Sequence, residues 1–191
     1  MKKFVLSVIA LVSMASMNAQ TLHKYEPEFI GETNLLCITG NDTTCVATEK
    51  KMGVVKAKAG ASLYLTGIGS VKSRVQVEGA TSNCVGSGAN SYRLIVKAAN
   101  NNQDPNSFIQ ILKFEVKGNK RRCVIAKVNT FGGSQSGADD VVAFQGKKYG
   151  ESAYLLNIPT DPGEYGIIVT DPNNRTEKNM TVYCYTIKAK E

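Results

Sequence analysis

Side chains that catalyse reactions are scarce in this chain. Its one histidine, His23, lies close to the N-terminus, where chains tend to fray. A serine or cysteine nucleophile needs a base within reach, and a histidine in that position is a poor one. The glycine- and serine-rich segment 132–137 does not match the G-x-S-x-G pattern of a nucleophile elbow, and we expect a flexible loop there. The sequence therefore argues against nucleophilic catalysis.

Paired carboxylates are the remaining route to catalysis, because glycoside hydrolysis needs two of them and no histidine. The candidate pairs are Asp139 with Asp140, Glu26 with Glu28, and Glu151 with Glu164. Nothing in their spacing brings two carboxylates to the separation that a hydrolase requires, and acidic residues are common in turns. A polysaccharide hydrolase is thus the alternative, and a protein without catalytic residues is the favoured interpretation.

Metal and cofactor sites lack their usual ligand sets. None of the five cysteines lies in a C-x-x-C pair, and a single histidine cannot complete a zinc site. The Asn- and Asp-rich segments 100–106 and 171–174 offer oxygen ligands, but neither follows the EF-hand spacing. We expect no metal and no cofactor.

Tyrosines are the better candidates for a binding role, since sugar rings stack on exposed aromatic faces. The chain has eight Tyr and no Trp. Tyr183 and Tyr185 share one face of a strand at period two, and Tyr149 lies near a loop, so these three are the predicted binding residues. The favoured interpretation of Tyr183 and Tyr185, however, is that their rings pack in the core and only their hydroxyl groups reach water.

The positive charge of the chain is spread along it. The formal net charge is +7, and the densest basic cluster is Lys120-Arg121-Arg122. A nucleic-acid site would need a concentrated basic stripe with interleaved aromatic residues. We therefore expect no nucleic-acid partner.

The first nineteen residues have the layout of a secretory signal peptide. Lys2 and Lys3 precede an apolar run over 4–12, and small and polar residues follow up to Ala19. That run is too short to span a membrane, and no later segment is long enough. We expect cleavage after Ala19, with Ala15 as the alternative. The product is then an exported protein of the periplasm, the extracellular space or the outer surface, with residues 20–191 in a single domain.

Alternating apolar and polar residues, interrupted by Gly, Asn, Asp and Pro, predict an all-β fold. We expect a two-sheet antiparallel β-sandwich of immunoglobulin-like or jelly-roll-like type. Its best-defined hairpin turns at Gly118-Asn119, a pair that suits a type II′ turn. This register places Glu115 opposite Arg122. It also places Leu112, Phe114, Cys123 and Ile125 on one apolar face, where Cys123 is a buried free thiol.

A second hairpin, around Gly40-Asn41, decides the chemistry of two cysteines. A three-residue loop places Cys37 directly opposite Cys45, close enough for a disulfide, whereas a two-residue loop places Cys37 opposite Thr44. Export would permit the bridge, and the sequence leaves both registers open. The tip of this hairpin, Asp42-Thr43-Thr44, resembles the O-glycosylation acceptor of some Gram-negative exporters, with Thr43 as the modified residue.

The C-terminal third carries a recognisable segment. Residues 148–156 and 162–169, with Gly163-Glu164-Tyr165-Gly166 at their centre, resemble a segment of uncharacterised secreted proteins of Bacteroidota. Residues 108–114 add to the likeness. The resemblance implies an exported, envelope-associated β module and transfers no catalytic residue.

These observations predict a secreted, non-catalytic β-sandwich protein of the cell envelope that binds a glycan or a protein partner. The first alternative is the hydrolase with paired carboxylates. The second is an envelope assembly subunit, which would use an unpaired edge strand to accept or donate β-structure.

Overall fold

The computed structural model describes residues 24–59, 70–129, 133–136, 140–170 and 179–189. The predicted signal peptide, His23 and Asp139 lie outside these residues. Within them the chain forms fourteen strands and one short 3-10 helix, η1 (Pro105–Ser107). The prediction of an all-β chain is confirmed.

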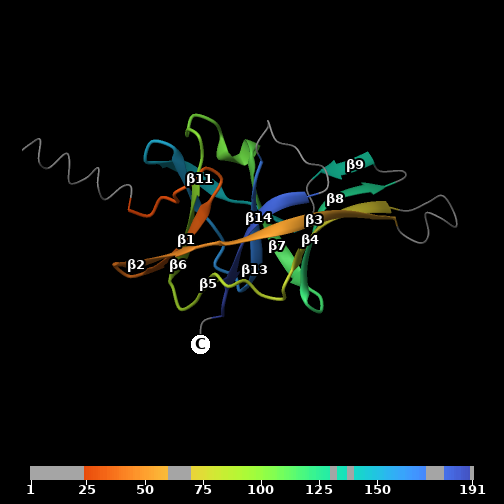
Figure 1. The fold of residues 1–191 in the computed structure, drawn as a ribbon, viewed down its shortest axis with the longest axis horizontal. Helices are drawn as coiled ribbons and strands as arrows, with labels where there is room; N and C mark the ends of the chain where they lie inside the picture. The colour runs from red at the N-terminus through yellow and green to blue at the C-terminus, as the bar shows by residue number, and fades with distance from the viewer. Residues whose placement is uncertain (1–23, 60–69, 130–132, 137–139, 171–178, 190–191) are drawn as a thin grey trace, which may run out of the picture.

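Five strands form an open antiparallel sheet, here called the small sheet (Figure 1). Their order across the sheet is β11, β12, β6, β1 and β2. The bounds are β1 (Thr33–Thr39), β2 (Asp42–Ala47), β6 (Ser91–Lys97), β11 (Gln145–Tyr149) and β12 (Ala153–Asn157).

Six strands of the second sheet close into a barrel. Their order is β7, β13, β14, β3, β4 and β8, and β7 pairs again with β8 through Glu115–Arg122 and Val116–Arg121. The bounds are β3 (Glu49–Ala59), β4 (Ser70–Glu78), β7 (Ile109–Val116), β8 (Lys120–Asn129), β13 (Gly163–Val169) and β14 (Asn179–Ile187). Three short strands flank it: β5 (Val85–Gly86) beside β14, β9 (Gly133–Ser136) beside β8, and β10 (Val141–Val142) beside β7. A simple two-sheet sandwich is therefore not confirmed.

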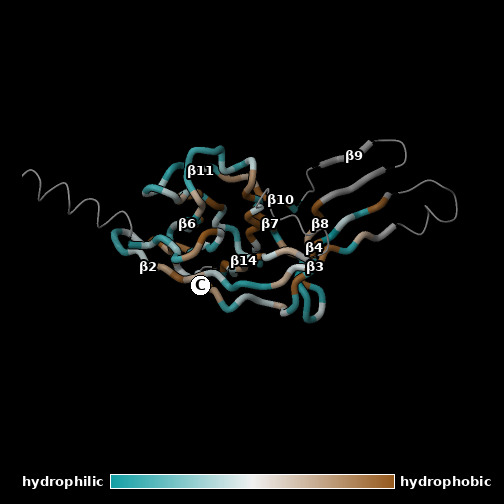
Figure 2. Tube along the Cα trace, turned by 45° about the horizontal axis from the view of Figure 1, so that its top comes forward, coloured by the Kyte–Doolittle hydropathy of each residue, from teal (hydrophilic) through white to brown (hydrophobic). Residues whose placement is uncertain are grey.

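The described residues form three apolar clusters: one inside the barrel, one between the barrel and the small sheet, and a smaller one on the outer face of the small sheet. Strand alternation produces the first two, because successive side chains on β7, β13 and β14 point alternately into the barrel and toward the small sheet. The barrel interior holds Val75, Val77, Leu112, Phe114, Cys123, Ile168, Val182 and Cys184. The interlayer core joins side chains of both sheets, among them Leu35, Leu94, Ile111, Tyr165 and Tyr185. Figure 2 shows hydrophobic segments around β6 and β7, where the layers meet, and hydrophilic outer loops.

The hairpin predicted at Gly118 is confirmed. Lys117 N donates to Lys120 O at 2.8 Å, and Glu115 lies opposite Arg122. Gly118 has a φ of 60° while no non-glycine residue among those described has a positive φ, as a type II′ turn requires. The predicted apolar face is also found, since Leu112, Phe114, Cys123 and Ile125 belong to the barrel interior.

The hairpin at Gly40 takes the two-residue register, so the Cys37–Cys45 disulfide is not formed. Cys37 lies opposite Thr44, and Cys45 lies opposite Leu36. A shift of one residue turns a side chain to the other face of the sheet. Cys37 is accordingly buried in the interlayer core, while Cys45 is exposed on the other side. All five cysteines are free thiols.

The segment predicted as a flexible loop over 132–137 contains strand β9 at Gly133–Ser136, which pairs with β8. A pattern rich in Gly and Ser lacks the β-branched residues that signal a strand, so local sequence gives no reason to expect this pairing.

Candidate functional site

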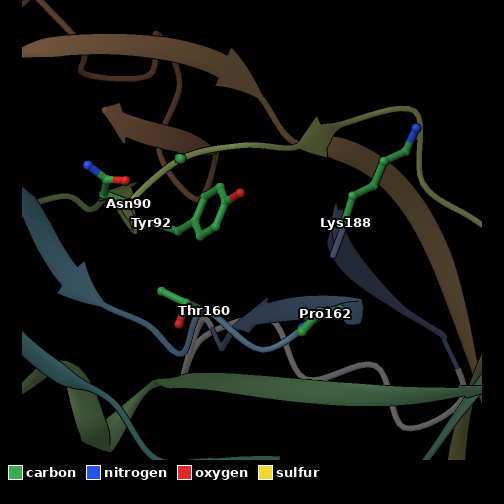
Figure 3. A pocket seen from close by; sticks show the side chains of 6 residues that line it. Asn90, Tyr92, Thr160, Pro162 and Lys188 are labelled. Atoms are coloured by element: carbon green, nitrogen blue, oxygen red, sulfur yellow. The ribbon is translucent and has the colours of Figure 1, made fainter. Parts of the chain in front are cut away.

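A small cleft opens at one end of the interface between the small sheet and the barrel. Its volume is about 280 Å³, and Ala89, Asn90, Tyr92, Thr160, Pro162 and Lys188 line it. In Figure 3 the ring of Tyr92 lies between Asn90 and Lys188, with Thr160 and Pro162 across from it. The lining residues come from three parts of the chain that only the folded layers bring together.

Strand β5 positions the two ends of this cleft. The backbone of Gly86 lies directly against Tyr92, because a Cβ placed on Gly86 would stand 2.6 Å from Tyr92 Cε1. Gly86 O also accepts a hydrogen bond from Lys188 N at 2.9 Å. On the other side, Asn90 N donates to Ile38 O at 2.8 Å. Tyr92 and the backbone of Lys188 are thus fixed against the same short strand.

The described residues that line the cleft are mostly polar. A carboxamide, a hydroxyl and an ammonium group are the kinds of side chain that orient a polar ligand, whereas Tyr92 is only 4% exposed and its ring belongs to the interlayer core. None of the described residues that line the cleft carries a carboxylate, so these residues supply no paired acid and base for glycoside hydrolysis.

The predicted binding tyrosines lie elsewhere and are not brought together. Tyr183 is 7% exposed and Tyr185 is fully buried in the interlayer core. Tyr185 stacks on Tyr165 with ring centroids 5.2 Å apart, and burial raises its pKa well above the ordinary value. Tyr149 is half-buried on the outer face of the small sheet, beside Tyr25. Period two correctly places Tyr183 and Tyr185 on one face, but that face is inside.

The predicted carboxylate pairs are also separated or engaged. Glu164 is buried in the end of the barrel, whereas Glu151 is exposed in the turn before β12. Asp140 Oδ2 accepts a hydrogen bond from Val124 N at 2.8 Å. Glu26 forms an ion pair with Lys97 at 2.5 Å, and Glu28 is exposed.

A buried ionic network fills the end of the barrel near β5, and Arg121 is its centre. This side chain is fully buried, with Nη2 3.1 Å from Glu49 Oε2 and Nη1 3.5 Å from Glu164 Oε2. Its Nε donates to Gly79 O at 3.1 Å. Glu164 also accepts hydrogen bonds from Ser82 N at 3.1 Å and Thr186 Oγ1 at 2.8 Å. This network ties the 79–82 loop across the barrel end and gives the two glutamates a structural role.

Glu49 pairs with two cations, Lys51 and Arg121. Burial alone would raise its pKa, but hydrogen bonds from Lys51 and Arg121 outweigh that effect, so the pKa lies below its ordinary value. Glu49 therefore remains ionised in neutral solution and counters the charge of Arg121.

Thr43, the predicted glycosylation residue, lies half-buried at the start of β2, between exposed Asp42 and Thr44. No cluster of three or more His, Cys, Asp or Glu side chains suited to a metal occurs among the described residues. In that same part of the chain, no helix has the length and apolar character needed to cross a membrane.

Sequence reasoning missed the cleft residues. Tyr92 and Lys188 lie far apart in the chain, and neither stands in a motif, so no local signal marks them. Comparisons with protein-family models, curated proteins and solved structures found no match to this chain.

Proposed function

We propose that this chain is an exported, non-catalytic β protein of the cell envelope that binds a glycan or a protein partner in the cleft beside Tyr92. The observation that carries the proposal is the convergence of Tyr92, Thr160 and Lys188 on one opening between the two layers. A polar end group of a ligand, such as a terminal sugar, fits a site of this size and composition.

The positions of Glu49 and Glu164 favour binding over hydrolysis. Glu49 and Glu164 are held on Arg121 inside the barrel end. Glu164 is buried and Glu49 is half-buried, and their ion pairs with Arg121 hold both carboxylates at the barrel end. A hydrolase would need two accessible carboxylates about 5 to 10 Å apart.

The layered fold supports the same proposal at the level of architecture. The small sheet packs on the barrel much as one layer of a sandwich packs on the other, and the cleft lies at the rim of that packing. Ligand sites at the rims of layered β domains are formed by loops on a rigid scaffold, and here the scaffold is the buried interlayer core.

A glycan array combined with a pull-down from envelope extracts tests the proposal. Tyr92→Phe removes the hydroxyl while keeping the buried ring, and Lys188→Ala removes the ammonium group from an exposed position. We expect each change to weaken binding of the captured ligand by about tenfold, as for one lost polar contact. Lys148→Ala, an exposed lysine on β11, is the matched control and should leave binding unchanged.

Two results would refute the cleft as the site. One is a ligand whose affinity is the same for wild type, Tyr92→Phe and Lys188→Ala. The other is the absence of any bound glycan or protein with the wild-type chain at high concentration.

A further inference from the structure

The barrel has a second feature, on the side formed by β3, β4 and β8. These strands, with β9, extend together away from the small sheet (Figure 1). Basic residues occupy opposing register positions across them. Lys56 pairs with Arg74, and Lys58, Lys72 and Lys127 are aligned across three neighbouring strands. We call these five positions the basic face.

Alternation places these positions on the outside of the barrel. Val55 and Val75 oppose each other and pack in the barrel interior. Their neighbours Lys56 and Arg74 therefore lie on the outer surface. Lys72 shares that surface with Arg74, because the β4 register against β3 runs without a shift. Lys56 is exposed, and Lys72 and Arg74 are half-exposed.

Among the described residues one carboxylate acts on this face, since the charge of Lys56 contributes, after that of Lys120, to lowering the pKa of Glu78. The described ion pairs join Lys51, Lys97, Lys120 and Arg121 to carboxylates, and none involves Lys56, Lys72 or Arg74. Like charges directly opposite each other across strands are destabilising. Lys56 and Arg74, which lie directly opposite each other, therefore repel each other across the strands.

We propose that the basic face binds an acidic polysaccharide, one whose sugars carry carboxylate or sulfate groups. The backbone positions of these basic residues recur about 4.8 Å apart across the strands and about 6.8 Å apart along them, which suits an extended chain of anions. Charge complementarity of this kind favours a polymer over a single small anion, because each added contact displaces further counterions. The surface is distinct from the cleft beside Tyr92 and extends the function beyond it.

Nucleic acid fits the face less well. Single-stranded nucleic acid needs aromatic side chains for base stacking, and the basic face has none. Two exposed apolar residues of β3, Met52 and Val54, share the outer face with Lys56, so an anionic membrane is the competing partner that the test must separate from a polysaccharide.

The test measures binding of the folded protein to polygalacturonate and dextran sulfate, with neutral dextran as the reference. The variant Lys56→Gln/Lys72→Gln/Arg74→Gln keeps most of each side chain and removes three charges. The control Lys117→Gln/Lys147→Gln/Lys148→Gln removes three exposed charges from other places. We expect at least one acidic polysaccharide to bind in a salt-dependent way, about tenfold or more weaker for the basic-face variant, and within twofold of wild type for the control.

A second readout separates binding from a structural role. Because the three cations repel one another, the basic-face variant should unfold at a temperature equal to or above that of wild type, although it binds more weakly. A lower unfolding temperature would contradict the proposed repulsion.

Three binding results would overturn the proposal. The first is no salt-dependent binding of either acidic polysaccharide by wild type. The second is equal loss in the two triple variants, which would reduce the effect to net charge. The third is tighter, basic-face-dependent binding to DNA or to phosphatidylglycerol vesicles than to the polysaccharides.

Discussion

Arg121 Nη1 lies 3.5 Å from Glu164 Oε2 although their strands, β8 and β13, are not neighbours in the sheet. The contact exists because β7 pairs with both β8 and β13 and closes the barrel. Glu49, from β3, completes the set with an oxygen 3.1 Å from Arg121 Nη2. The network therefore depends on closure of the barrel, and its removal should destabilise the whole fold.

Arg121→Met should lower the free energy of unfolding by about 3 to 5 kcal/mol, because it leaves two carboxylates in the barrel end without their shared cation. Urea denaturation followed by circular dichroism measures this change. The neighbouring Arg122→Met is the control and should cost less than about 1 kcal/mol, since Arg122 is half-exposed on the outer surface. A loss below 1 kcal/mol for Arg121→Met would contradict the structural role given to the network.

Acid should weaken the fold through Glu49. The pKa of Glu49 in the folded state is held below its ordinary value of 4.5. A carboxylate of this kind contributes stability above its unfolded pKa, and that contribution is lost as the pH falls through the folded pKa. We expect the midpoint of urea unfolding to fall as the pH is lowered from neutral to below the ordinary pKa of glutamate.

Glu49→Gln isolates this contribution. The variant should be less stable than wild type at neutral pH, and the difference should shrink in acid, where wild-type Glu49 is protonated. Urea midpoints at a series of pH values measure both chains. A difference that stays constant with pH would show that Glu49 does not cause the pH dependence of stability.

Part of this arrangement could be predicted from the sequence. The Gly118-Asn119 hairpin depends on local turn chemistry, and its register places Glu115, Arg122 and Cys123 correctly. The same period-two argument places Arg121, two residues before Cys123, on the buried face. Because Arg121 lies within the basic run Lys120-Arg121-Arg122, it was interpreted as part of an exposed cluster. The alternation that indicates its burial was present in the sequence, but the charge of the run argued against it.

The closure of the barrel and the cleft could not be predicted in this way. Closure depends on pairings between distant strands, such as β14 with β3 and β4 with β8, which no short pattern encodes. The disulfide between Cys37 and Cys45 required a three-residue loop at Gly40. The structure has the two-residue loop, which places Cys37 opposite Thr44. The burial of Tyr183 and Tyr185 agrees with the favoured interpretation that their rings pack in the core, but the sequence cannot reveal which layer covers their strand.

The segment Gly163-Glu164-Tyr165-Gly166 gives a packing prediction. Gly166 faces the barrel interior, where an added Cβ would stand 2.5 Å from Phe114 Cε2 and 2.7 Å from Val182 Cγ1. Gly166→Ala should therefore cost about 1 to 3 kcal/mol through overpacking. A double-mutant cycle with Phe114→Leu checks the cause. The penalty of Gly166→Ala should be smaller in the Phe114→Leu background, and equal penalties in both backgrounds would exclude the clash with Phe114.

The five thiols should differ sharply in reactivity. Cys45 is exposed, whereas Cys37, Cys84, Cys123 and Cys184 are buried. Burial raises the pKa of Cys84, Cys123 and Cys184 to about 12, which keeps these groups as unreactive thiols at neutral pH. Burial also raises the pKa of Cys45, but its thiol is the exposed one, so brief treatment of the folded protein with iodoacetamide, followed by peptide mass spectrometry, should modify Cys45 first. Unfolding in urea without a reductant should then allow all five cysteines to react.

Fewer than five modified residues would mean that a disulfide forms in the isolated protein, contrary to the free thiols described here. Early modification of Cys84 or Cys184 would instead show that the core around β5 opens readily.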